Sequence, residues 1–308
     1  MIKFVTHNEI DKRRWDECIA NAINGNIYVW SWYLDIIHPR WDALIDGDYE
    51  RVIPITGKQK LGISYLFQPF FAQQLGIFSR THLTQDHVDN FIEVIKNKFN
   101  ITDYNLNIYN KVDSESPYII KHRNIELDLI SNYQTLYNNY SSNTKRNLSK
   151  AEKQGLSFIN YSDPEDVIRL FRNNKGKGLK HWGDKEYERL LLLINTAIEK
   201  EHCITCGIND IEQNHVAGAV FMCSHDKIIF FFSGCDESNK HNHALTMLID
   251  SIIRSFSETQ NTLDFEGSDN DGLARFYKGF GGKEIFYPGI KYNNLNIILK
   301  FACKLIGK

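Results

Sequence analysis

The chain has 308 residues, and its 36 Lys and Arg nearly balance its 38 Asp and Glu, which gives a formal net charge of -2. This balance argues against a dedicated nucleic-acid-binding protein and so against a DNA partner. Hydrophobic residues make up 42% of the chain and charged residues 24%, proportions that exclude intrinsic disorder and allow a core without a disulfide or metal. The length predicts two domains or one large domain.

The start of the chain, Met1–Ile10, lacks the basic and then apolar order of a secretory signal, and no apolar stretch reaches the length of a membrane span. We therefore expect a cytoplasmic protein with free thiols. Cys203 and Cys206 have metal or redox spacing, but on the strand predicted there they would point to opposite faces. We expect a structural role for both and no metal site.

The first half of the chain mixes helical periodicity with short β-rich runs. A helix is predicted near 9–23 and an amphipathic helix over 86–99. The polar segment 138–153 is expected to connect the two halves. The predicted strands of this half are 51–56, 61–67, 104–109 and 125–129.

The second half has a clearer order of elements. A helix over 187–198 precedes three consecutive strands that short turns join into a meander. The order from the meander onward is β-β-β-α-β-α-β, and the whole pattern predicts an α/β fold of two similar units in tandem. Its predicted segments are strands 203–209, 215–223 and 227–234, helix 242–257, strand 262–266, helix 272–279 and strand 284–292.

Polar residues that could carry chemistry gather in the tract 263–282, where a strand ends and a short helix begins. Asp264 and Glu266 are expected on one face of that strand, at the end where α/β sites tend to lie. Their structural alternative is a cap or ion pair that supports the turn. In the helix, Leu273, Phe276 and Phe280 are expected to form the apolar stripe, which leaves Arg275 and Tyr277 off it.

This tract resembles the late signature of the GNAT acyltransferase superfamily, in which an Asn, an Ala and a Tyr on a short helix precede Gly-Phe. Here the matching residues are Asn270, Ala274 and Tyr277, followed by Gly279-Phe280. Together with Asp264-Phe-Glu-Gly-Ser268 and Asn143-Thr-Lys-Arg-Asn-Leu-Ser-Lys-Ala151, the tract is more specifically similar to the Fem-type branch of tandem-GNAT transferases.

The resemblance implies two GNAT-like units, each with a mixed, mostly antiparallel sheet flanked by helices. A degenerate first unit would span 1–135 and a transferase unit 136–308. Whether the last ~15 residues return to the first unit stays open, since chain ends often pack beside other elements.

The resemblance also implies a donor site at the start of helix 242–257, where backbone N–H groups favour a pyrophosphate. The family pattern there has Gln or Arg, then Gly, then Gly or Ala. This chain keeps Ala244 but has Asn239 and Asn242 at the other two positions, and it adds His241 and His243. The expected donor is acyl-CoA or aminoacyl-tRNA, used as a co-substrate, with no permanently bound cofactor.

Acyl transfer to an amine needs a base, polarisation of the acyl carbonyl and an acid for the leaving group. Glu266 is predicted as the base or as the ligand of the substrate amine, with Asp264 as second choice. Tyr277 resembles the general acid of acyl-CoA enzymes; its alternative is a half-buried helix residue. The predicted substrate-binding residues are Arg146, Lys180, Trp182 and Arg275, with solvated helix faces and core anchoring as the alternatives.

The sequence thus predicts a bacterial, Fem-like N-acyltransferase acting on an amine of a cell-envelope precursor, such as one of peptidoglycan, or of a small or nucleotide-linked metabolite. The two basic stretches, 145–153 and 172–180, keep tRNA among the predicted partners. The alternative is a catalytically silent tandem-GNAT scaffold that binds a nucleotide, glycan or protein. Zipped fourth and fifth strands of the second unit would favour the scaffold, and an open slot between them would favour the enzyme.

Overall fold

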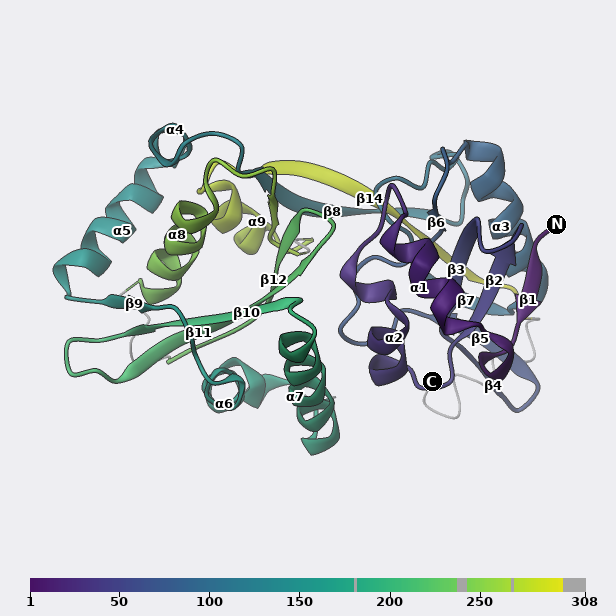
Figure 1. Ribbon diagram of the computed structural model, residues 1–308, viewed down its shortest axis with the longest axis horizontal. Helices are drawn as coiled ribbons and strands as arrows, with labels where there is room; N and C mark the ends of the chain where they lie inside the picture. Colours follow the sequence, from purple (N-terminus) through teal and green to yellow (C-terminus); the bar gives the residue numbers. More distant parts are fainter. Residues whose placement is uncertain (180–181, 237–242, 267–268, 296–308) are drawn as a thin grey trace. The chain divides into compact units, whose positions relative to one another are not determined.

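The computed structural model describes residues 1–179, 182–236, 243–266 and 269–295 (Figure 1). The chain divides into two compact units. Unit 1 contains Met1–His122 and the described residues from Phe286 on, and unit 2 contains Arg123–Ile285. These bounds differ from the predicted 1–135 and 136–308, because two strands, β8 (Ile119–Asp128) and β14 (Lys283–Asn293), each run from one unit into the other.

Unit 1 is built on two groups of strands and three α-helices. The first group has the order β1-β2-β3-β6 and is antiparallel throughout. The second has the order β4-β5-β7-β14, in which β5 and β7 run parallel. The elements are β1 (Lys3–Val5), α1 (Lys12–Ala20), α2 (Ser31–Ile37), β2 (Asp42–Asp46), β3 (Arg51–Ile55), β4 (Gly57–Lys60), β5 (Ile63–Phe67), β6 (Phe78–Ser79), α3 (Gln85–Lys98) and β7 (Ile101–Asn105), with 3-10 turns at His7–Glu9 and Ile27–Val29.

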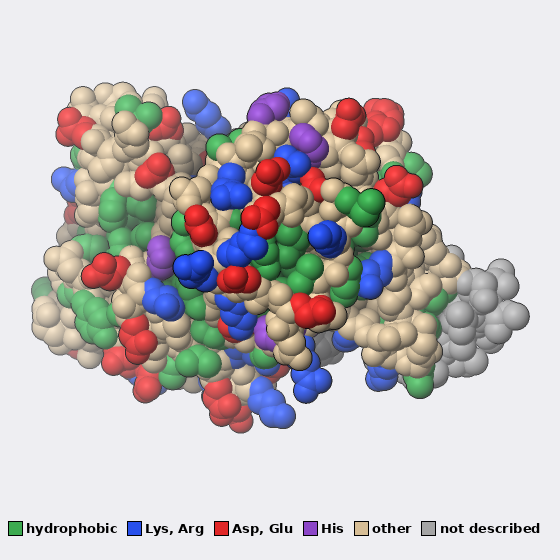
Figure 2. All heavy atoms as spheres, turned by 45° about the vertical axis from the view of Figure 1, so that its right-hand side comes forward, with side chains coloured by type: hydrophobic (Ala, Val, Ile, Leu, Met, Phe, Trp, Pro, Cys, Tyr) green, Lys and Arg blue, Asp and Glu red, His purple; other side chains and the backbone are tan. Residues whose placement is uncertain are grey.

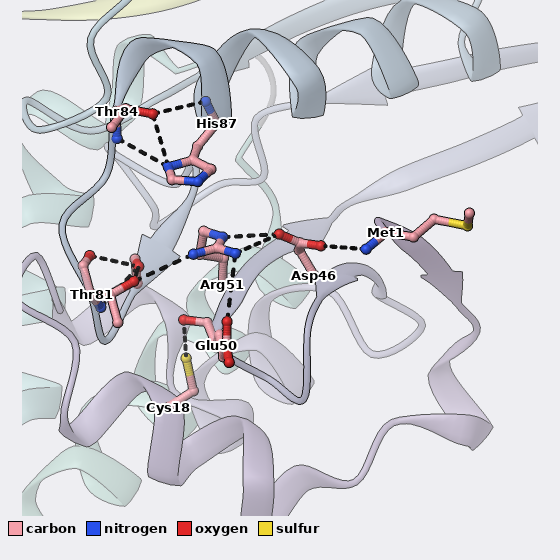
Figure 3. A network of polar contacts seen from close by, with 9 residues as sticks. Met1, Cys18, Asp46, Glu50, Arg51, Thr81, Thr84 and His87 are labelled. Carbon is pink, nitrogen blue, oxygen red and sulfur yellow. Dashed lines mark hydrogen bonds and ion pairs between the residues drawn. The ribbon is translucent and has the colours of Figure 1, made fainter.

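Aromatic packing and a polar network hold unit 1 together. Trp15 and Trp41 are fully buried, with ring centroids 4.6 Å apart. At the surface, Arg51 on β3 pairs with Asp46 on β2 at 2.8 Å (Figure 3). On the face shown in Figure 2, basic and acidic side chains are interspersed, which agrees with the balanced composition. None of the described helices is long and apolar enough to cross a membrane.

Unit 2 contains a sheet with the strand order β8-β13-β12-β11-β10-β9. The helices α6 and α7 lie on one face, and α5, α8 and α9 lie on the other (Figure 1). Only β12 and β13 are parallel neighbours. The elements are α4 (Tyr133–Asn138), α5 (Ser142–Lys153), β9 (Ser157–Ile159), α6 (Pro164–Asn173), the 3-10 turn η3 (Lys175–Gly178), α7 (Asp184–Glu199), β10 (Cys203–Asn209), β11 (His215–Ser224), β12 (Lys227–Cys235), α8 (Ala244–Phe256), β13 (Thr262–Asp264) and α9 (Asp271–Lys278).

The segment expected as a connector, 138–153, is instead mostly the helix α5. The side chain of Ser141 caps it by accepting a hydrogen bond from the Thr144 backbone N–H at 3.1 Å. Thr144, Leu148 and Ala151 bury one narrow face, while the basic residues between them stay outside. The apolar stripe of this helix is only three small or medium residues long.

Helix α8 carries a buried carboxylate that fixes the neighbouring helices. Asp250 accepts hydrogen bonds from the hydroxyls of Tyr133 at 2.9 Å and Tyr140 at 3.0 Å. Both tyrosines precede α5, so the contact ties α4 and the start of α5 to α8. Burying a charge is costly unless it is paired and hydrogen-bonded, and here the two hydroxyls supply the partners.

Two of three glycines in register, Gly218 and Gly234, allow α6 to pack closely on the sheet. Gly207, Gly218 and Gly234 lie side by side on β10, β11 and β12. A Cβ atom at Gly234 would lie 2.4 Å from the backbone oxygen of Val167 and 2.6 Å from the backbone nitrogen of Phe171, both on α6. The helix therefore rests on backbone at this point.

We predict that Gly234→Ala lowers the free energy of unfolding by about 1–3 kcal/mol, because α6 has to move away from β12. Urea denaturation of the variant and the wild type measures the change. Gly178→Ala in η3 is the matched control, since nothing lies within 4 Å of the added Cβ there. Equal stability of the two variants would contradict the close approach of α6.

Candidate active site

The parallel strands β12 and β13 separate shortly after they begin. Their hydrogen-bonded register covers Lys227–Ile229 and Thr262–Asp264 only. Beyond these three pairs β13 ends, while β12 continues to Cys235. On its other edge, β12 contains a bulge, since Phe230 pairs with Phe221 but Phe232 pairs with the adjacent Val220. The fourth and fifth strands of this unit therefore form an open fork.

The bulge changes which side chains of β12 face α8 and α9. Before it, Ile228 and Phe230 belong to the core under these helices. After it, Gly234 faces α6, and Ser233 and Cys235 line a cavity. One extra residue thus reverses the alternation of the strand just where it loses its partner β13.

Tyr277 on α9 occupies the point at which the strands part. Its ring stacks on Phe265, with centroids 4.8 Å apart, and meets the edge of Phe230 at 6.1 Å. Phe230 and Phe265 are the first residues after the last paired ones, Ile229 and Asp264. Burial, with a smaller effect from the charge of Glu266, raises the pKa of the Tyr277 hydroxyl above its ordinary value. The hydroxyl therefore keeps its proton at neutral pH.

The buried face of α9 differs from the predicted one. Ala274 and Tyr277 face the core, whereas Leu273 is 41% exposed and lines the cavity together with Phe276. The helix begins at Asn270, whose side chain accepts hydrogen bonds from the N–H groups of Gly272 and Leu273. The expectation is wrong for Leu273, which is exposed, and for Tyr277, which is buried; Phe276 packs against the core and Phe280 is buried, as expected.

A cavity of about 390 Å³ opens along the part of β12 that has no partner strand. It reaches across both faces of the sheet edge, since helices from both layers contribute to it. At the start of α8, His243 has a left-handed backbone (φ 59°), and no side chain caps the helix there. The lining residues are Asn147 on α5, Phe171 and Asn174 at the end of α6, Lys175, then Ser233, Cys235 and Asp236, then His243, Ala244, Leu245 and Thr246, and finally Leu273 and Phe276 on α9.

The predicted donor-binding and substrate-binding residues divide into four groups. His243 and Ala244 line the cavity. Trp182 packs against Phe171, which lines it, with centroids 5.7 Å apart. Arg146 and Arg275 are exposed on α5 and α9 and are not among the lining residues. The remaining four, Asn239, His241, Asn242 and Lys180, lie outside the described residues.

The sequence analysis missed the contribution of α5 and α6 to the cavity. A signal for α6 was present, because Asp163 and Pro164 are a typical helix start and an apolar stripe follows. The polar lining residues Asn147 and Asn174 have no local pattern that marks them, since they meet only through the fold.

Asp264 is buried, and both of its carboxylate oxygens have partners. Oδ1 accepts hydrogen bonds from Asn124 Nδ2 at 2.8 Å and from the Glu266 backbone N–H at 2.9 Å. Oδ2 lies 3.3 Å from Lys227 Nζ, which also pairs with Glu126. Burial, and then the charge of Asp264, raise the pKa of Glu126 to about 7. Two carboxylates thus share one ammonium group.

Glu266 follows β13 rather than belonging to it. The strand ends at Asp264, two residues before the predicted end, and Glu266 has a left-handed backbone (φ 50°). The expectation that Asp264 and Glu266 share one strand face is therefore wrong. The charge of Glu266 contributes to the raised pKa of the Tyr277 hydroxyl.

No protein-family model and no curated protein matches the sequence. Among solved structures, FemX superposes with a TM-score of 0.64 and 12% identity over 97% of this chain and 99% of that chain. The chain has a Fem-like GNAT fold. The α/β class and the Fem-type resemblance predicted from the sequence are confirmed at the level of the fold.

Two further structures share this fold. A conserved protein of unknown function from Bacteroides thetaiotaomicron superposes with a TM-score of 0.59 and 12% identity, over 95% of this chain and 100% of that one. The C-terminal domain (DUF2156) of a lysylphosphatidylglycerol synthetase from Agrobacterium fabrum has a TM-score of 0.55 and 11% identity, over 96% and 95%. Identities this low carry information about the fold alone.

We predict that the stability of the protein depends on pH through Glu126. Between its unperturbed value of 4.5 and its raised pKa of about 7, the folded chain holds a proton that the unfolded chain has released. Raising the pH through this window therefore lowers the free energy of unfolding, by roughly 1–3 kcal/mol. Urea midpoints at pH 5 and pH 8 measure the loss.

Glu126→Gln is the comparison for this experiment, because the amide does not ionise. The variant is expected to lose less stability than the wild type over the same pH range. An equal loss in both proteins would show that Glu126 titrates in its ordinary range.

Proposed function

We propose that this chain is an N-acyltransferase of the bacterial cytoplasm. It transfers an acyl group from a CoA thioester, or an aminoacyl group from tRNA, to an amine of a cell-envelope precursor or small metabolite. The open fork between β12 and β13 with the cavity along it is the observation that supports the proposal most strongly. A similar structure comes from a lysylphosphatidylglycerol synthetase. The name of that protein refers to an aminoacylated product, which supports the transfer of an aminoacyl group.

In this proposal the donor lies along the free edge of β12. An extended arm can add to an exposed strand edge through backbone hydrogen bonds, and Ser233 and Cys235 line that edge. The phosphates of the donor then lie at the start of α8, where the helix dipole favours anions. Lys175, which lines the same cavity, supplies a positive charge.

The reaction needs three proton transfers, after which Glu266 releases its proton to solvent. Glu266 takes a proton from the ammonium group of the acceptor, and the neutral nitrogen attacks the acyl carbonyl carbon. As the C–N bond forms, the C–S bond of a thioester or the C–O bond of an ester breaks. Tyr277 gives its proton to the leaving sulfur or oxygen, and the second proton lost by the nitrogen restores the Tyr277 hydroxyl. Arg146, Lys180, Trp182 and Arg275 are proposed to bind the acceptor.

One observation favours the scaffold alternative. Asp264, Glu266 and Tyr277 are not among the residues that line the cavity, so a ligand could fill the cavity without meeting them. A silent scaffold would bind acyl-CoA or charged tRNA without transferring the group to any amine. Binding with no release of free CoA or uncharged tRNA in the presence of an amine distinguishes this alternative from the enzyme.

Tyr277→Phe is expected to lower kcat by about 10²-fold, the usual contribution of a general acid, and to leave KM nearly unchanged. The apolar contacts of the ring with Phe230 and Phe265 remain, so the melting temperature should change little. A thiol-release assay with acyl-CoA, or a deacylation assay with charged tRNA, gives the rate. Unchanged turnover would remove Tyr277 from the acid role.

Ser233→Tyr is expected to fill the cavity and weaken donor binding at least about tenfold, since the added ring takes the volume that the donor needs. Isothermal calorimetry with acetyl-CoA and gel-shift titration with charged tRNA measure the affinity. Ser255→Tyr makes the same change at an exposed site on α8 and serves as the control. If both variants bind as the wild type does, the donor lies elsewhere.

A further inference from the structure

Four polar side chains meet on the sheet face that lies away from Tyr277. Leu263 of β13 and Phe265, just after the strand, belong to the core beneath α8 and α9, so Asp264 between them points to the opposite face. The same alternation places the two polar residues of β8 and the lysine of β12 on that face. The cluster consists of Asn124 and Glu126 on β8, Lys227 on β12 and Asp264 on β13.

The cluster fixes the carboxylate of Asp264 from three directions. Asn124, which is fully buried, donates to Oδ1, and its own amide is oriented because its oxygen accepts the Ile125 backbone N–H at 2.9 Å. Lys227 approaches Oδ2, and Glu126 holds Lys227 in place. A carboxylate with both oxygens engaged is poorly arranged to take a proton from a substrate. The geometry of the Asp264 carboxylate suits a group that holds another residue in position.

The third partner of Asp264 is the backbone of Glu266. Its N–H donates to Oδ1 at 2.9 Å, and the residue is in the left-handed region that side chains other than glycine rarely adopt. Such a conformation persists only where its surroundings impose it, and it is frequent at functional sites. A continued strand would have sent Glu266 to the same face as Asp264. The turn instead takes Glu266 out of the strand alternation.

We propose that Asn124, Lys227 and Asp264 are positioning residues, which hold Glu266 in its left-handed conformation and so fix the place of its carboxylate. This inference rests on the proposed transferase function. Under this proposal Asp264 is a positioning residue rather than a catalytic residue. Asn124 and Lys227 have the same positioning role. Catalysis would then depend on residues of β8 and β12 that touch neither donor nor acceptor.

A double-mutant cycle tests whether Asp264 acts through Glu266. Glu266→Gln and Asp264→Ala are each expected to lower kcat by about 10²-fold, since a small displacement of a catalytic group costs that much. If Asp264 acts only by positioning Glu266, the double variant is no slower than either single one. A drop of about 10⁴-fold in the double variant would mean independent roles and would overturn the proposal.

The matched control is Asp250→Ala, which removes another buried aspartate of unit 2 that is outside the cluster. It is expected to lower stability and to leave kcat unchanged. Asn124→Ala is a milder variant that removes one hydrogen bond to Asp264, and it should lower kcat in the same direction. A kcat loss in Asp250→Ala equal to that in Asp264→Ala would attribute the effect to general loosening of the fold and would overturn the proposal.

Hydrogen exchange of the Glu266 amide gives a readout that does not depend on activity. The amide should exchange at least about tenfold faster in Asp264→Ala than in the wild type, because it loses its acceptor, and should be unchanged in Asp250→Ala. Unchanged exchange in Asp264→Ala overturns the positioning role. If the wild type transfers no acyl group from acetyl-CoA or charged tRNA to an amine, the proposed function fails, and the exchange rates still decide whether Asp264 holds Glu266.

Discussion

The parallel pairing of β12 with β13 stops after three residue pairs, because β13 ends at Asp264 while β12 continues through a bulge. Among the described residues, no strand therefore pairs with this edge of β12 beyond Ile229. Exposed edges of this kind tend to pair with whatever extended chain reaches them. The edge of β12 is bordered by α5, α6, α8 and α9. Only a narrow ligand can therefore reach this edge.

The fork also organises the two faces of the sheet. On the α8 and α9 face, Tyr277 fills the angle between the strands with its ring against Phe230 and Phe265. On the other face, the charge cluster around Lys227 joins β8, β12 and β13. Breaking one partner of such a buried cluster is costly, whereas the intact cluster adds little net stability. The presence of this charge cluster is therefore easier to explain by its effect on the geometry of the fork than by a gain in stability.

Much of unit 2 could be predicted from local signals. The strands of the meander, β10, β11 and β12, and the helix α8 are close to their predicted bounds, because turns and apolar spacing mark them. The bulge could not be predicted, since residues 228–232 are all apolar and alternation carries no information there. Helix α5 is hard to recognise from apolar spacing, because most of its surface is polar or charged.

Candidate site residues could be proposed from the sequence where they lie in one contiguous tract. Residues that meet only through the fold could not. Tyr277 and Glu266 share one tract, and both could be proposed from it. Glu126 and Lys227 are 101 residues apart, and no local pattern indicates that they would meet. The role of Asp264 depends on these distant partners, which is why the sequence could not distinguish a base from a supporting group.

The discontinuous composition of unit 1 has a consequence for synthesis on the ribosome. Strand β7 pairs with β14 through Ile101–Asn105 and Gly289–Asn293, and the whole of unit 2 is translated between them. Until β14 emerges from the ribosome, the edge of β7 that pairs with it has no partner strand. The inserted unit 2 can already fold during this time. The nascent chain is thus expected to finish its second unit before its first, and β7 is the strand most exposed to mispairing during that interval.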